Sequence, residues 1–181
     1  MNDANITFRL AQAADADAVV GLVNSAYRGT YSKQGWTTEA DLLDGQRADA
    51  EMITALIEPP HNQLLLMHAG AELIGSVHLA CAGALGYLGM FTVEPSQQGE
   101  GLGRLFLHAS EQFLQHQRGC NQLEITVISL RTELIDWYLR RGFAATGETR
   151  TFPRGDPRYG IPKRQDLVLK VFEKTLEVKP T

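Results

Sequence analysis

The sequence predicts one mixed α/β (α+β) domain, and three observations support this prediction. Short apolar runs with strand periodicity alternate with longer segments whose apolar residues keep helical spacing. The chain has 181 residues, 44% of them hydrophobic and 21% charged, which is enough to bury a core. No internal repeat, low-complexity tract or linker divides it, so we expect a single domain over residues 1–181.

The N-terminal third is expected to contain a strand and then helices. Apolar residues alternate in "ITFRLA" (6–11), as in a half-buried strand. Asp15 or Asp17 can cap a helix that runs toward Tyr27. "TEADLLDG" (38–45) and "ADAEMITALIE" (48–58) are interpreted as two helical pieces, which end at "PPHN" because proline cannot continue a helix.

The middle of the chain predicts three strands and a long helix. "QLLLMHAGAELIGSVHLACAG" (63–83) is typical of a hairpin that turns at Gly70 and Ala71. "LGYLGMFTV" (85–93) is a further strand, which Pro95 ends. From Leu102 to about residue 117 the apolar residues keep helical spacing, and Gly119 is the expected terminator.

The remaining segments predict a strand, a helix and two more strands. "QLEITVI" (122–128) suits a strand that is buried on both faces. "TELIDWYLRRGF" (132–143) is a short helix with two arginines near its C-terminal end. "AATGETRTF" (144–152) and "QDLVLKVFEKTL" (165–176) are the last expected strands, on either side of a proline-rich loop.

Composition argues against several classes of protein. A formal net charge of -4 predicts no general attraction to nucleic acid or to an anionic membrane. No apolar segment approaches the roughly 20 residues that cross a bilayer, and "MNDANITFRL" does not resemble a secretory signal. Cys81 and Cys120 form no CxxC pair, which argues against a disulfide framework or a zinc site. We therefore expect a cytoplasmic protein without a metal.

Residues 97–104, "QQGEGLGR", place three glycines at alternate positions between an expected strand and an expected helix. Glycine lets successive backbone N–H groups point into one concave nest, which a ligand can approach without meeting a Cβ. Together with the positive end of the helix, this predicts an anion site, most naturally for a pyrophosphate. Neither a P-loop nor a GxGxxG dinucleotide fingerprint fits the spacing. A tight turn before a helix is the simpler alternative.

The wider stretch "MFTVEPSQQGEGLGRLFL" resembles motif A of the GNAT N-acetyltransferase superfamily, with Gln98-x-x-Gly101-x-Gly103 as its core. Downstream, "DWYLRRGF" resembles the family's helix-and-corner signature, and Tyr138 lies where its catalytic tyrosine falls. The resemblance covers residues 6 to about 172. It implies the GNAT fold, a mixed and mostly antiparallel sheet of about seven strands with a splayed parallel pair and about four flanking helices.

The resemblance implies acetyl-CoA as co-substrate and no metal. Backbone groups of the strand would pair with the pantetheine, and amides of the glycine run would hold the pyrophosphate. Arg104 is equally well explained as a solvated helix residue, and Arg131 stands where the family often has an asparagine. The residues assigned to the cofactor are Phe91, Thr92, Val93, Gln98, Gly99, Glu100, Gly101, Leu102, Gly103, Arg104 and Arg131.

The resemblance further implies direct attack of an amine on the thioester in a ternary complex, with an oxyanion stabilised by a backbone N–H near Phe91. Tyr138 is the expected acid for the leaving thiolate, and packing in an amphipathic helix is its alternative. The strand before the glycines contains no acid, so Glu124 on the next strand is the candidate base. Its alternative is a salt bridge to an arginine, and His78 is a weaker candidate.

The acceptor is expected beside the loop between the first two helices. Glu39, Asp41 and Asp44 in that loop could attract a cation, but they can also be ordinary helix-capping acids. An aromatic loop packed on the sheet is the alternative to an acceptor pocket. The residues assigned to the acceptor are Tyr27, Tyr31, Trp36 and Tyr87.

The leading functional hypothesis is an acetyl-CoA-dependent N-acetyltransferase that acts on a primary amine of a small molecule, as a monomer or homodimer. Acetylation of a protein N-terminus or lysine is the second hypothesis, and it would favour an open peptide groove. A CoA-binding sensor or interaction module without turnover is the third.

Overall fold

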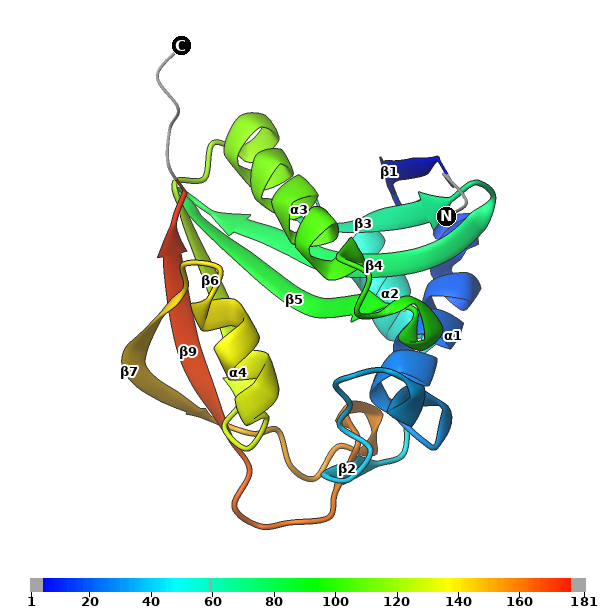
Figure 1. Ribbon diagram of the computed structural model, residues 1–181, viewed down its shortest axis with the longest axis vertical. Helices are drawn as coiled ribbons and strands as arrows, with labels where there is room; N and C mark the ends of the chain where they lie inside the picture. Colours follow the sequence, from blue (N-terminus) through cyan, green and yellow to red (C-terminus); the bar gives the residue numbers. More distant parts are fainter. Residues whose placement is uncertain (1–4, 59, 177–181) are drawn as a thin grey trace.

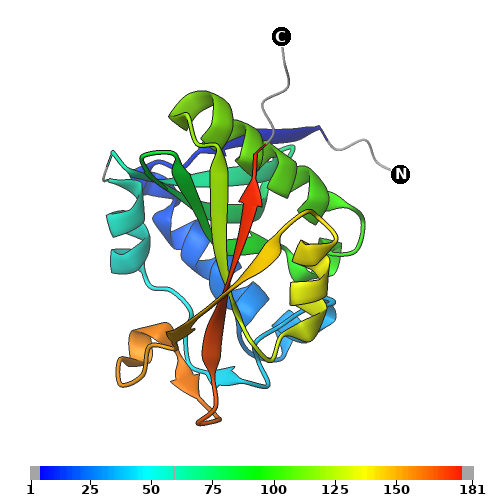
Figure 2. The same ribbon diagram turned by 90° about the vertical axis from the view of Figure 1, so that its left-hand side faces the viewer.

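The computed structural model describes residues 5–58 and 60–176, which form a seven-stranded mixed sheet with helices on both faces (Figure 1 and Figure 2). The order of strands in the sheet is β1-β3-β4-β5-β6-β9-β7. The strands are β1 (Ile6–Leu10), β3 (Asn62–Ala69), β4 (Glu72–Ala82), β5 (Leu85–Val93), β6 (Gln122–Ile128), β7 (Ala144–Thr151) and β9 (Val168–Thr175). The α-helices are α1 (Ala16–Tyr27), α2 (Ala50–Ile57), α3 (Leu102–Arg118) and α4 (Thr132–Leu139).

Helices α1 and α2 cover one face of the sheet, and α3 and α4 cover the other. Alternation along β3 divides its side chains between these two layers. Leu64 and Leu66 pack with apolar residues of α1 and α2, whereas Leu65 and Met67 belong to the core cluster that includes Phe106 of α3. Strand β3 is therefore buried on both sides, which explains its continuous apolar run.

The predicted splayed pair is confirmed at β5 and β6. These two parallel strands pair only from Leu85 with Gln122 to Tyr87 with Glu124, and their C-terminal parts separate. In the separated part of β5, Met90 has a left-handed φ of 46°, and the pairing with β4 shifts register there. A bulge of this kind bends the strand, so β5 diverges from β6 and leaves space between them.

The prediction of a helix over residues 38–45 is wrong. The segment forms a single turn at Glu39 and then the short strand β2 (Leu43–Asp44), which pairs with β8 (Ile161–Pro162). Leu43 is 1% exposed and packs with Phe152, so tertiary contacts outweigh local helix propensity here. The pairing ties the loop before α2 to the long loop between β7 and β9 at the lower end of the molecule (Figure 1).

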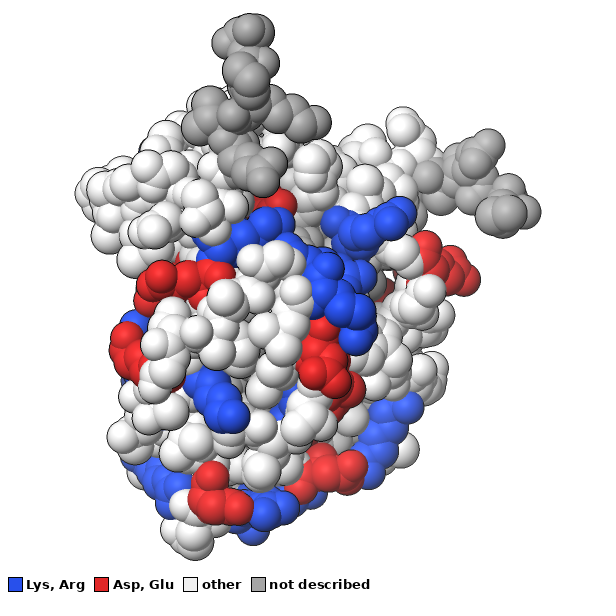
Figure 3. Space-filling model, turned by 60° about the vertical axis from the view of Figure 1, so that its left-hand side comes forward, with Lys and Arg blue, Asp and Glu red and all other residues white. Residues whose placement is uncertain are grey.

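Cys81 and Cys120 are free thiols whose Sγ atoms lie 3.0 Å apart. On the face shown in Figure 3, basic residues gather in the upper part and acidic residues border them, while the two signs are mixed over the lower part. Within residues 5–58 and 60–176, none of the helices has the length and apolar character needed to cross a bilayer.

Candidate active site

A cavity of about 460 Å³ extends from the glycine run, past the separated ends of β5 and β6, to the loops that precede α2 and follow β7. Most of the site residues expected from the sequence line it. These are Tyr27, Trp36, Tyr87, Phe91, Val93, Gln98, Gly99, Gly101, Gly103, Arg104, Arg131 and Tyr138. The structure thus brings the residues assigned to cofactor, acid and acceptor into one continuous space.

The three glycines at the mouth of the cavity have two different structural roles. Gly99 and Gly101 have φ values of 91° and 86°, and a Cβ at either position would meet no atom within 4 Å. Both therefore have left-handed backbone beside open space, as a nest that admits an anion requires. Gly103 lies inside α3, where a Cβ would come within 3.3 Å of the Trp137 ring. It allows α3 and α4 to pack closely.

Gln98 connects the glycine run to the end of β5. Its Nε2 atom donates to the carbonyl oxygen of Val93 at 3.0 Å. Its Oε1 atom is buried and has no hydrogen-bond partner among the described residues. A Cβ built on Gly35 would lie 2.3 Å from this atom, so the backbone of Gly35 packs against it.

Positive charge gathers beside the glycine run. Arg104 and Arg141 both line the cavity there, and the Arg141 guanidinium lies 3.6 Å from the centre of the Trp137 ring. Burial, together with the charges of Arg140 and Arg104, lowers the pKa of Arg141. With two guanidinium groups in its lining, this end of the cavity is suited to an anion.

Tyr138, on α4, lines the cavity and is 4% exposed. Its ring packs edge-on against Trp137 and Phe143, with centroids 5.0 and 5.3 Å away. Burial raises the pKa of Tyr138, so its hydroxyl stays protonated at neutral pH. That hydroxyl makes no hydrogen bond to another described residue, which leaves its proton available for a ligand in the cavity.

Tyr27, at the end of α1, touches the bulged part of β5. Its hydroxyl donates to the carbonyl oxygen of Phe91 at 3.1 Å, and burial raises its pKa. Tyr87 lines the same side of the cavity, and its ring lies over Gly89, where a Cβ would come within 2.6 Å of it. Gly89 is needed for this ring position.

Four of the residues expected to bind the cofactor or the acceptor do not line the cavity. Tyr31 is 43% exposed, and its hydroxyl donates to Glu94. Thr92 is buried in β5, with its hydroxyl donating to the carbonyl oxygen of Met90 at 2.9 Å. The remaining two are Glu100 and Leu102. Side chains of these four residues are therefore not brought to the cavity, and for Glu100 and Leu102 only a backbone role remains as a prediction.

Glu124 also lies outside the cavity lining. Its two carboxylate oxygens accept hydrogen bonds from Arg150 at 2.7 and 3.0 Å. This is the salt bridge weighed as the alternative to catalysis, and the role of general base stays a prediction. His78 hydrogen-bonds to Asn62 at 2.9 Å and is likewise absent from the lining. Among the described residues, no group of three or more His, Cys, Asp or Glu side chains could hold a metal ion.

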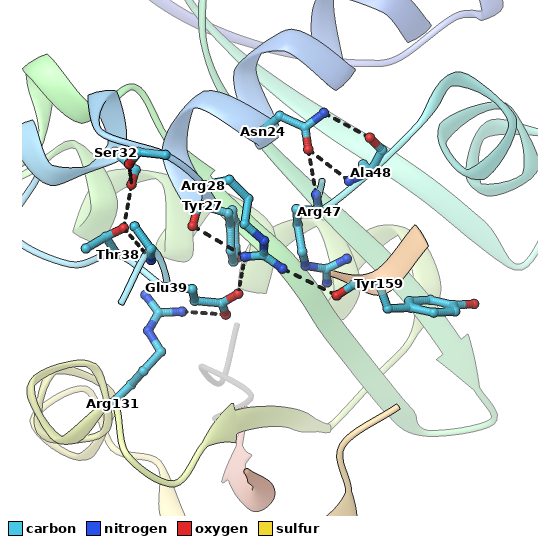
Figure 4. A network of polar contacts seen from close by, with 12 residues as sticks. Asn24, Tyr27, Arg28, Ser32, Thr38, Glu39, Arg47, Ala48, Arg131 and Tyr159 are labelled. Carbon is cyan, nitrogen blue, oxygen red and sulfur yellow. Dashed lines mark hydrogen bonds and ion pairs between the residues drawn. The ribbon is translucent and has the colours of Figure 1, made fainter. Parts of the chain in front are cut away.

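Arg131 takes part in an ion-pair network at the far end of the cavity. Its Nη1 donates to Glu39 Oε1 at 2.9 Å and its Nη2 to Thr37 Oγ1 at 2.7 Å. Arg28 Nη1 donates to the other oxygen of Glu39 at 2.5 Å. Figure 4 shows the Glu39 carboxylate between the two guanidinium groups. Glu39 is therefore neutralised, and Arg131 lies between this network and Gln98, with which it lines a small second pocket.

Sequence reasoning missed three arginines that line the cavity, namely Arg28, Arg47 and Arg141. Arg141 follows directly after α4 in "LRRGF", where two arginines mark the end of a helix but do not show which of them turns inward. Arg28 and Arg47 lie in the loop-rich segment between α1 and α2, where no local pattern indicates which charges are buried.

The comparison with family models gives one match, to the acetyltransferase (GNAT) domain, over residues 27–154. A search of curated proteins gives no match.

Solved structures share the fold at low sequence identity. The ribosomal-protein-S18-alanine N-acetyltransferase from Escherichia coli has a TM-score of 0.69 at 14% identity, covering 97% of this chain and 96% of that one. The protein yncA from Salmonella typhimurium, solved with its cofactor acetyl-CoA, has a TM-score of 0.65 at 18% identity with the same coverage. A variant of spermidine N-acetyltransferase SpeG from Vibrio cholerae has a TM-score of 0.68 at 12% identity, covering 96% of this chain and 95% of that one.

Proposed function

The chain belongs to the GNAT acetyltransferase family, and from this premise we propose that it transfers the acetyl group of acetyl-CoA to a primary amine of a small molecule. The observation that carries the proposal is the single cavity that joins the glycine run, Tyr138 and the acceptor wall. A donor and an acceptor can therefore occupy one space with a proton donor between them.

The residues at the mouth of the cavity fit acetyl-CoA. Open left-handed backbone at Gly99 and Gly101, with Arg104 and Arg141 beside it, suits phosphate groups. Gln98 lines the cavity between this backbone and the end of β5. Acetyl-CoA, when bound, supplies an acyl group that is activated as a thioester. Together these residues would bind its anionic part and orient the acyl group toward the gap between β5 and β6.

In the proposed reaction the amine nitrogen forms a bond to the acyl carbon, and the carbon–sulfur bond breaks. The attacking amine loses one proton, to solvent or to a base, and the departing thiolate gains one. Tyr138 is the proposed source of that second proton, because it lines the cavity and its raised pKa keeps its hydroxyl protonated. Backbone N–H groups of β5 near Phe91 are proposed to stabilise the charge on the acyl oxygen.

The walls of the cavity favour a small acceptor over a protein. The loop before α2 and the loop after β7 are tied by β2 and β8, and by Lys163, whose Nζ bonds to the Ala40 carbonyl at 2.8 Å. Trp36, Phe152 and Tyr159 line the cavity from these loops. Such tied loops leave less room for an extended peptide. The relatives named above act on a protein alanine and on spermidine, so fold similarity alone does not select the acceptor.

The proposal is tested with a panel of small amines and short peptides, by following thiol release from acetyl-CoA with the parent protein and with Tyr138→Phe. This change keeps the ring and its packing but removes the proton donor. We expect turnover to fall about 10²-fold or more, while calorimetric titration gives unchanged CoA affinity.

The panel also separates the competing functions. CoA binding without acetylation of any amine would reject the enzyme in favour of a sensor. Faster acetylation of peptides than of every small amine would reject the small acceptor. Equal rates for the parent and Tyr138→Phe would reject Tyr138 as the proton donor and leave it a packing role only.

A further inference from the structure

The acceptor end of the cavity has an excess of positive charge. Arg28 at the end of α1, Arg47 in the loop before α2, and Arg131 at the start of α4 all line it. Glu39 is the one acidic residue among those that line the cavity in the described chain. Three guanidinium groups against one carboxylate leave two positive charges at this wall.

Each oxygen of the Glu39 carboxylate accepts a hydrogen bond from one of these arginines, Arg28 or Arg131. Burial alone would raise the pKa of Glu39, but the charges of Arg131, Arg28 and Arg47 outweigh burial and lower it. The side chains of Arg28, Glu39 and Arg131 are 5%, 9% and 8% exposed, so their charges are poorly screened by water. Glu39 therefore holds its two arginines in place and has no capacity left for a cationic ligand.

Donors remain unsatisfied around this network. The Nε atoms of Arg28 and Arg131 are buried and have no hydrogen-bond partner within the described residues. The Arg47 guanidinium lies 5.5 Å from the centre of the Tyr27 ring, and no hydrogen bond or ion pair joins it to a described carboxylate. Figure 4 shows Arg28 and Arg47 reaching the same region from different segments. Gly160 packs over the Nε and Nη2 atoms of Arg28, since a Cβ built on it would lie 3.4 and 2.9 Å from them. Arg47 is therefore the arginine of this wall whose charge is left for an oxyanion to balance.

We propose that the acceptor amine carries an oxyanion, a carboxylate or a phosphate, which binds Arg47 and is attracted by the charges of Arg28 and Arg131 beside it. This inference rests on the proposed function, because acetyl transfer defines the acceptor. Other acids of the same loop do not offset the charge, since Asp41 pairs with Lys33 at 2.7 Å and Asp44 with Lys163 at 3.0 Å. A polyamine would bring several positive charges against a wall that is already positive.

The test compares amines of the same carbon skeleton with and without the anionic group, with kcat/KM referred to the free amine at the assay pH. Leucine is compared with leucinamide, and O-phosphoethanolamine with ethanolamine, while spermidine represents polycations. In each pair we expect kcat/KM to favour the anionic member by about 10- to 100-fold, the value of one or two hydrogen bonds to a charged group. The pair with the larger ratio identifies the carboxylate or the phosphate.

Arg47→Gln is the decisive variant, because it removes a charge without breaking the Glu39 ion pairs. We expect the preference for the anionic member to collapse by about 10-fold or more, and Arg47→Lys to restore part of it. Arg164→Gln is the matched control. Arg164 is exposed in the neighbouring loop, where it pairs with Asp166 at 2.7 Å and does not line the cavity. In Arg164→Gln the ratio of kcat/KM for the anionic member to that for its partner should equal the ratio in the parent.

A second readout does not require turnover. Binding of the members of both pairs to the CoA-bound protein is measured by calorimetry in chloride buffer. Anion-selective binding that Arg47→Gln abolishes would support the anion site even if no amine is acetylated, a result that would reject only the proposed function. If amines are acetylated but uncharged or cationic ones equal or exceed their anionic partners, the inference is overturned and acetyl transfer stands. Equal calorimetric binding within both pairs, O-phosphoethanolamine with ethanolamine and leucine with leucinamide, overturns it too.

Discussion

At the scale of single residues, Glu124 is the side chain for which two roles predict different measurements. Its carboxylate is held by two hydrogen bonds from Arg150 and lies outside the cavity. The Glu124 side chain is 12% exposed and that of Arg150 is 41% exposed. Water therefore partly screens the pair, and its contribution to stability is modest, of order 1 kcal/mol.

For Glu124→Gln we expect the behaviour of a lost ion pair. The melting temperature should fall by about 1–3 °C, and the pH–rate profile should run parallel to that of the parent. Arg150→Gln breaks the same pair from the other side and should give a similar decrease. Thermal melts and steady-state rates between pH 6 and 9 measure both quantities. A rate that is low near neutrality and recovers at high pH, seen for Glu124→Gln alone, would instead identify Glu124 as the base.

At the scale of elements, the connection from β5 to α3 combines backbone strain with open space. Gly101 caps α3 with a φ of 86°, and nothing lies within 4 Å of a Cβ built there. Gly147 in β7 has a φ of 85° and equally open surroundings, but it does not line the cavity. Substitutions at these two glycines therefore separate the loss of folding stability caused by a strained backbone from the loss of CoA affinity caused by a blocked site.

Gly101→Asp should lower the affinity for CoA by at least about 10-fold, because it adds a side chain and a negative charge where phosphates are proposed to bind. Gly147→Asp should leave that affinity unchanged. Both variants should lose about 1 kcal/mol of stability from the left-handed backbone. Calorimetric titration and thermal melts give both values. Equal CoA affinity of folded Gly101→Asp and the parent would reject the glycine nest as the pyrophosphate site.

The connection from β5 to α3 was predictable from the sequence because its physics is local. A strand, a glycine-rich turn and an amphipathic helix follow one another within residues 85–118, and each has its own periodicity or terminator. The segment 38–45 was not predictable in this way. Its helix-forming residues are overruled by the pairing of β2 with β8 and by the burial of Leu43, both of which involve residues more than a hundred positions away.

The acceptor wall was least accessible to sequence reasoning, for the same reason. Glu39 looks like a helix-capping acid beside Thr38, yet its carboxylate bonds to Arg131, 92 positions later in the chain. The sequence drew attention to Tyr138 and the glycine run because both lie in compact motifs, and residues of both line the cavity. A buried ion-pair network drawn from three separate segments becomes visible only when the topology brings them together.

At the scale of the whole molecule, we expect the stability of the fold to depend on pH through His78, a histidine of the central sheet. Its imidazole hydrogen-bonds to Asn62 at 2.9 Å, and its ring centroid lies 5.8 Å from that of Tyr87. Burial, with a smaller contribution from the charge of Arg47, lowers the pKa of His78 from 6.5 to about 4. His78 is therefore neutral in the folded protein at pH values where an unfolded chain would bind a proton there.

We expect this difference to destabilise the protein as it is acidified. Because the pKa is lower in the folded state, the stability contributed by neutral His78 is fully present above about pH 6.5 and is lost as the pH falls toward 4. Between pH 7 and 5 the loss should reach up to about 2 kcal/mol. His78→Gln should flatten the decline of stability over this interval by a similar amount, whatever its effect at pH 7. His116→Gln, an exposed change on α3, should decline like the parent. Urea unfolding at half-unit steps of pH measures the three slopes, and a parental slope in His78→Gln would mean that this histidine is protonated without cost in the folded sheet.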